Sequence, residues 1–171
     1  MAEVYTVTFI LIGVLLSLPA LLVALNLLYP KLTERIEVRL EKTPRRSFVM
    51  GLPIPAVFLS LGIPLVSTGG PAQAMGIIIL VIFMGLGSLG GAGMSRLLGK
   101  RLNELGQPKS KLISLVRGAV VYEMACLVPL VGWFLFIPLA GITLIGATTF
   151  ALLGWLPRRP VADEVMVNPI Q

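Results

Sequence analysis

The chain contains no histidine and a single cysteine, Cys126, among its 171 residues. These absences exclude an intrachain disulfide, an axial histidine ligand to a haem or chlorophyll, and a metal site of clustered histidines and cysteines. There is also no G-x-S-x-G motif and no paired-carboxylate pattern. We therefore expect neither an enzyme nor a metal protein, and the sequence leaves any other cofactor unknown.

Charged residues are scarce, at 13% of the chain, whereas 56% of the residues are hydrophobic. Apolar runs of about 18 residues or more are typical of helices that cross a bilayer. The pattern predicts an all-α integral membrane protein with about five transmembrane helices in one membrane domain. The expected spans are residues 4–28, 48–67, 72–98, 112–131 and 134–155.

The positive charge is confined to three short segments, residues 31–46, 96–117 and 158–159. Basic residues near span ends are retained on the cytoplasmic side of a membrane. Five spans place all three segments on that side, with the N-terminus outside and the C-terminal tail, residues 157–171, inside. We expect a bacterial inner or internal membrane, and anionic lipids rather than nucleic acid as partners of the net charge of +6.

The connector between the first two spans, residues 30–46, has a helical pattern. Leu32, Ile36 and Leu40 share one face of a helix, with acidic and basic residues on the others. We expect a short amphipathic helix in the headgroup plane, the alternative being a solvated loop with a docked apolar face. The residues expected to contact lipid headgroups or a partner are Arg35, Arg39, Lys42, Arg45 and Arg46, with Arg96, Lys100 and Arg101 from the loop 96–117.

Small residues recur at helical spacing in the third and fifth spans. In the third span they are Gly87, Gly91, Ser95 and Gly99, and in the fifth they include Ala140, Thr143, Ala147 and Ala151. Such rows let two helices approach closely in a membrane. The partner helix is a span of this chain, a second copy or another subunit. Residues 85–90 also match GxGxxG, but they lie inside an apolar span, so helix packing is the better interpretation.

Glu123 is the one acidic residue placed well inside an expected span. An ionisable residue at membrane depth is costly and is a functional candidate for proton carriage, cation coordination or pairing with a partner's cation. The structural alternative is a carboxyl that is neutral or hydrogen-bonded near the headgroups. Arg117, six residues earlier, lies near the basic interface, which favours this second interpretation. Asn26 and Tyr122 add polar groups without forming a site with it.

Several motifs from Arg45 onward resemble a family of small bacterial polytopic membrane proteins found beside, or fused to, polymer-forming bactofilin-like domains. They are the basic pair before Ser47-Phe48-Val49-Met50-Gly51-Leu52, then Leu61-Gly62-Ile63-Pro64, Ser95-Arg96-Leu97-Leu98-Gly99-Lys100-Arg101, and Leu127-Val128-Pro129-Leu130-Val131-Gly132-Trp133. The resemblance covers about two-thirds of the chain and implies no catalytic residues. It implies that Gly62-Ile63-Pro64 forms the turn between two spans.

These observations favour an accessory, assembly or anchoring subunit of a larger membrane complex. Its partners would be other integral membrane subunits or its own copies, together with anionic lipids. One alternative is a small proton- or ion-coupled transporter or channel that uses Glu123 and the second span, which Pro53, Pro55 and Pro64 interrupt. The other, which rests on the resemblance, is a membrane anchor for a cytoplasmic filament.

Overall fold

The computed structural model describes residues 2–106 and 110–155, and every regular element in that part of the chain is a helix. The all-α expectation is therefore confirmed. The elements are α1 (Ala2–Leu28), α2 (Pro30–Lys42), α3 (Pro44–Gly51), α4 (Pro53–Ser67), α5 (Gly70–Leu105), α6 (Lys111–Leu127), the π-helix η1 (Val131–Phe136) and α7 (Ile137–Leu152).

Four helical segments of the described chain are long and apolar enough to cross a membrane. They are Tyr5–Leu28, Pro44–Ser67, Gly70–Leu105 and Val131–Leu152. The chain is therefore a multi-pass membrane protein by the length and composition of its helices. The expected fourth span corresponds to α6, which has only 17 residues.

Proline and glycine divide the second span and the hairpin that follows it. Pro53 begins α4 directly after α3, so the broken span is two successive helices, while Pro64 is accommodated inside α4. Helix α4 continues through Gly62 and Pro64 to Ser67, so the turn implied by the family resemblance is not at Gly62. The turn lies instead at Gly69 and Gly70, whose φ angles of 74° and 65° suit residues without a Cβ.

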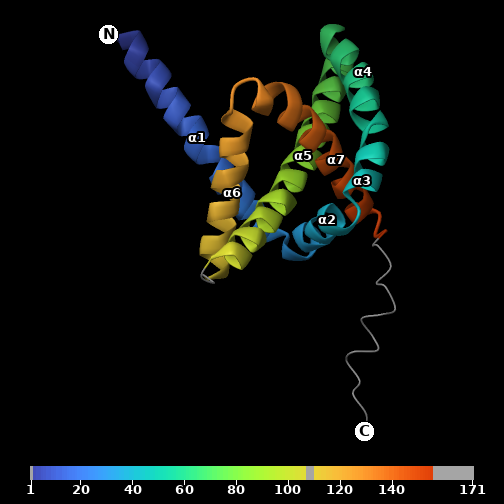
Figure 1. Cartoon of the computed structure of the whole chain (residues 1–171). Coiled ribbons are helices and arrows are strands. Elements are labelled where there is room, and N and C mark those ends of the chain that lie inside the picture. The colour runs from blue at the N-terminus through green and yellow to red at the C-terminus, as the bar shows by residue number, and fades with distance from the viewer. Residues whose placement is uncertain (1, 107–109, 156–171) are drawn as a thin grey trace.

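Helix α5 is the centre of the molecule and contacts α1, α2, α4, α6 and α7. Figure 1 shows α2 lying across the end of the bundle where α1 finishes and where α5 leads into α6. The N-terminal end of α1 and the α4–α5 hairpin lie at the opposite end (Figure 1). Successive long helices thus run in alternating directions, and α2 covers one end of the bundle.

Close backbone contact between α5 and α6 depends on glycine. A Cβ added at Gly118 would overlap the Ser95 carbonyl oxygen and lie 2.6 Å from the Gly99 nitrogen. A Cβ at Gly99 would in turn overlap the carbonyl oxygen of Ser114. The small residues therefore allow the two backbones to touch, which maximises dispersion contact in a medium where helix association has little hydrophobic driving force.

A second crossing of the same kind joins α3 to α7. A Cβ at Gly51 would overlap the Ile142 carbonyl oxygen, and one at Gly146 would overlap the Ser47 carbonyl oxygen. This reciprocal contact holds the first half of the broken second span against the last helix. Helix α3 follows α2 in the chain, so this contact also positions the basic residues that follow α2.

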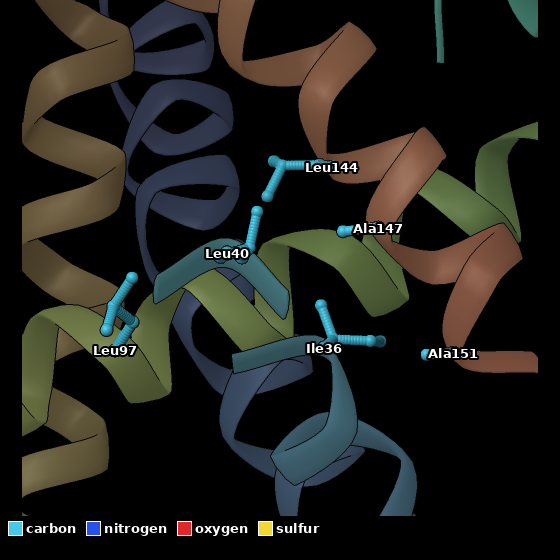
Figure 2. Close-up of a cluster of buried hydrophobic side chains, with 6 residues drawn as sticks. All are labelled: Ile36, Leu40, Leu97, Leu144, Ala147 and Ala151. Atoms are coloured by element: carbon cyan, nitrogen blue, oxygen red, sulfur yellow. The ribbon is translucent and has the colours of Figure 1, made fainter. Parts of the chain in front are cut away.

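The apolar face of α2 packs against protein, as Figure 2 shows for Ile36 and Leu40. Their neighbours in this buried cluster are Leu97 of α5 and Leu144, Ala147 and Ala151 of α7. Ile36 is fully buried, partly because Gly93 of α5 leaves room for its branched side chain. A helix is present, but it ends at Lys42, short of the expected 30–46, because α3 begins at Pro44. Its apolar stripe is covered by α5 and α7.

Candidate functional sites: a charged helix junction and an intramembrane cavity

The acidic face of α2 meets two cations on α5. Arg96 Nε lies 2.7 Å from a Glu37 carboxylate oxygen, and Arg96 Nη2 lies 3.4 Å from Glu34. Lys100, one turn further along α5, donates to Glu41 at 3.0 Å. Residues at this spacing share a helix face, so the two charge rows lie opposite each other. The pairs hold α2 across the end of α5.

Glu37 is the most enclosed acid of this junction, with its side chain 10% exposed. Burial raises the pKa of the Glu37 carboxyl above its ordinary value, and the Arg96 and Lys100 cations offset only part of that effect. Its ionised form therefore depends on Arg96 remaining in place. Arg96 and Lys100, which the sequence placed in the headgroup or partner set, thus have partners within the chain.

Arg39 occupies a different environment from the other basic residues of α2. Its side chain is buried, and its guanidinium carbon lies 4.4 Å from the centre of the Phe150 ring on α7. Burial lowers the pKa of Arg39, and the positive charge of the nearby Arg46 lowers it further. A cation over an aromatic face is a favourable contact, so Arg39 contributes to the packing of α2 on α7.

The remaining basic residues at this end are exposed and form no ion pair within the described ranges 2–106 and 110–155. We call this set the basic platform; it comprises Lys31, Arg35, Lys42, Arg45, Arg46, Arg101, Lys111 and Arg117. Five of its members, Lys31, Arg35, Lys42, Arg45 and Arg46, lie on α2 and α3. Lys109, Arg158 and Arg159 lie outside the described residues.

A polar cavity of about 470 Å³ opens beside the junction, between α2, α5 and α6. Its charged lining residues are Glu37, Arg96, Lys100, Glu104 and Lys111. Arg96 and Lys100 are already paired with acids of α2, so Glu104 and Lys111 are the lining charges without an ion pair in the described chain. The cavity adjoins the platform through Lys111.

Asn26 links α1 to α5 through a contact that sequence reasoning did not identify. Its buried amide Nδ2 donates to the Ala92 carbonyl oxygen at 2.8 Å and to Ser95 Oγ at 3.2 Å. Polar side chains that bond across helices stabilise membrane bundles. The signal available in the sequence was a lone amide in the last turn of an apolar span, which does not identify its partner.

The predicted small-residue rows lie in two kinds of environment. Gly91, Ser95 and Gly99 are buried between helices of this chain, as are Ala147 and Ala151. Ala140 and Thr143 are half-buried. The sequence did not identify the matching small residues of the partner helices, which are Ser47, Gly51, Ser114, Gly118 and Gly146.

Gly87 does not pack against another helix; it lines a cavity of about 290 Å³ between α1, α5, α6 and α7. Glu123 lines the same cavity and is 5% exposed. Tyr122, Ser88 and several aliphatic side chains complete the wall. The structure thus places Glu123 inside the bundle, with an apolar space beside it.

The described part of the chain holds no group of three or more His, Cys, Asp or Glu residues that could bind a metal ion. Comparison of the chain with known proteins finds no matching family model, no matching curated protein and no matching solved structure. The features that bear on function are the charged junction, the basic platform and the cavity beside Glu123.

Proposed function

We propose that the chain crosses the membrane about five times and serves as an accessory, assembly or anchoring subunit, with its basic platform on the cytoplasmic side. In this topology α6 is the fourth span, the N-terminus is outside and the C-terminus is inside. The alternating helix directions in Figure 1 support it, because they bring α2 and the α5–α6 connection to one end. A 17-residue helix is about 26 Å long, close to the hydrocarbon thickness of a bilayer.

The observation that carries this proposal is that the basic residues fall into two groups, one paired with acids of α2 and one exposed. Arg96 and Lys100 are neutralised by acids of α2, whereas Arg35, Lys42 and the Arg45–Arg46 pair remain exposed and unpaired within the described chain. The ion pairs hold α2 in place, and α2 carries exposed basic residues of the platform. A rigid cationic surface next to a bilayer suits anionic headgroups and an acidic surface of a neighbouring subunit.

The small-residue faces are used largely within the chain, so they leave little smooth surface for lateral partners. The crossings at Gly118 and Gly146 are filled by α5 and α3. Contact with another subunit would therefore use the platform and the lipid-facing aliphatic side chains. The half-buried Ala140 and Thr143 add to the surface formed by the lipid-facing aliphatic side chains.

The test is gentle detergent extraction from the native membrane, followed by native-gel separation and mass spectrometry of the band that contains this chain. Co-migration with a defined set of larger subunits is the expected result. A polymer-forming protein in the band would favour the filament-anchor alternative. Migration alone, or as a small homo-oligomer, would count against an accessory role.

A variant with Arg35, Lys42, Arg45 and Arg46 all changed to Gln should lose these partners while still inserting in the membrane. The matched control exchanges Arg for Lys, and Lys for Arg, at the same four positions and keeps the charge. Protease protection of the tail checks that both variants retain the wild-type orientation. Equal partner recovery from both variants would remove the platform from the interaction.

The transporter alternative is favoured by one observation, the intramembrane cavity that Glu123 lines. A carboxylate enclosed by apolar walls is the kind of group that carries a proton or pairs with a cation in transport. Proteoliposomes with wild-type chain and with Glu123→Gln should then differ in proton-coupled uptake. If the chain is only an accessory subunit, neither preparation should show coupled uptake.

A further inference from the structure

The cavity beside Glu123 lies between four helices, is partly open to the outside of the chain, and has glycines where side chains could fill it. Gly87 of α5 and Gly141 of α7 both line it, and a Cβ built at either position would meet no atom within 4 Å. Elsewhere on these two helices, at Gly99 and Gly146, a Cβ would overlap backbone. The two cavity glycines are thus not needed for close packing, and they leave about 290 Å³ unfilled.

Glu123 has no partner for its charge within the described chain. Its residue is 5% exposed, and no described residue forms a hydrogen bond or ion pair with its carboxylate. The cavity lining includes no Lys or Arg. Because a carboxylate among apolar side chains is unfavourable without a counter-charge, a ligand that brings a positive charge would bind there in preference to a neutral one.

Two aromatic rings line the same cavity as the carboxylate. Phe83 comes from α5 and Tyr122 from α6, directly before Glu123 in the chain. Aromatic faces attract ammonium groups through the ring quadrupole, and the attraction grows when water is excluded. One acid, two rings and a wall that is otherwise mostly apolar match the chemistry of an amine with an apolar body.

We propose that this cavity binds a small amphiphilic organic cation, with its ammonium group at Glu123 and its apolar body between α1, α5 and α7. The volume is near the lower end of ligand-binding sites, which span roughly 300–1,000 Å³, so the ligand is about the size of one ring with a short chain. The cavity is separate from the basic platform. A negative result for ligand binding in this cavity would therefore leave the accessory role untouched, and the reverse also holds.

The test uses three probes of matched shape and different charge: 4-phenylbutylammonium, 4-phenylbutanol and 4-phenylbutyrate. Saturable binding is measured on the full chain in nanodiscs, with empty nanodiscs to subtract partitioning into lipid. The ammonium should bind at least about tenfold more tightly than the alcohol, and the carboxylate should show no saturable binding.

Two variants locate the site. Glu123→Gln should abolish the preference for the ammonium over the alcohol, and Gly87→Leu should fill the cavity and weaken both probes. Gly85→Leu is the matched control, because Gly85 lies on the same helix with open space around its Cβ and does not line the cavity. It should bind the ammonium like the wild type.

Three results would overturn the proposal. Equal binding of the alcohol and the ammonium would mean that the carboxyl is neutral in the cavity and does not select a cation. Absence of saturable ammonium binding to a wild-type chain that runs as a single species would mean that the cavity holds no such ligand. Equal loss of binding in Gly85→Leu and Gly87→Leu would place the site elsewhere.

Discussion

Arg96 of α5 lies 2.7 Å from the Glu37 carboxylate of α2, and this contact joins two helices that are far apart in the sequence. Arg96 Nη1 also reaches the carbonyl oxygen of Pro30, at the start of α2, at 3.3 Å. One guanidinium therefore contacts both a backbone group and two acids of the same helix. This fork geometry explains how α2 is held across the bundle end.

Replacing Arg96 with Gln should lower the free energy of unfolding by about 2 kcal/mol, because the enclosed Glu37 carboxylate loses a charged hydrogen-bond partner. The measurement is reversible unfolding in mixed detergent micelles near neutral pH. Arg101→Gln is the control, since Arg101 is exposed on the same helix and has no ion pair in the described chain. Similar losses in both variants would show that the Arg96–Glu37 contact adds little.

Protonation of Glu37 should make stability depend on pH. Burial raises the pKa of Glu37 in the folded chain above its ordinary value of 4.5, so the folded state holds the proton where the unfolded state has lost it. The contribution of Glu37 to the free energy of unfolding should therefore fall as pH rises from 4.5 through the raised value. Above that value the contribution should be constant.

Subtracting the stability of Glu37→Gln from that of the wild type, between about pH 4 and about pH 8, isolates this contribution. The free energy of unfolding of the wild type minus that of Glu37→Gln should become smaller as pH rises. A shift in the opposite direction would mean that the Arg96 cation, and not burial, dominates the carboxyl.

Gly118→Ala should destabilise the chain by about 1–3 kcal/mol, because the added methyl group overlaps the Ser95 carbonyl oxygen and forces α5 and α6 apart. Thermal unfolding of the purified chain measures the loss. Gly85→Ala is the matched control: no atom lies within 4 Å of its Cβ, and alanine favours a helix over glycine. A Gly118 variant as stable as the control would contradict the close crossing.

The helical class and the position of most breaks could be predicted from local signals. Long apolar runs predict helices, and the expected spans 48–67 and 72–98 leave a short break between them. The positive φ angles of Gly69 and Gly70 form the turn between α4 and α5 in that break. The implied turn at Gly62-Ile63-Pro64 was wrong because a membrane helix tolerates a proline, and α4 runs through the exposed Pro64 to Ser67. Gly62 does pack there, against Leu80 of α5.

The sequence by itself determined that this is a helical membrane protein with its basic residues confined to three segments, because hydropathy and charge act locally along the chain. Only the tertiary structure decided that α2 turns its apolar face to α5 and α7, since lipid and protein interiors are equally apolar and the stripe fits either. The partners of Glu37, Asn26 and Gly118 were likewise decided by packing. Contacts between helices distant in the sequence depend on how those helices cross, which no local pattern specifies.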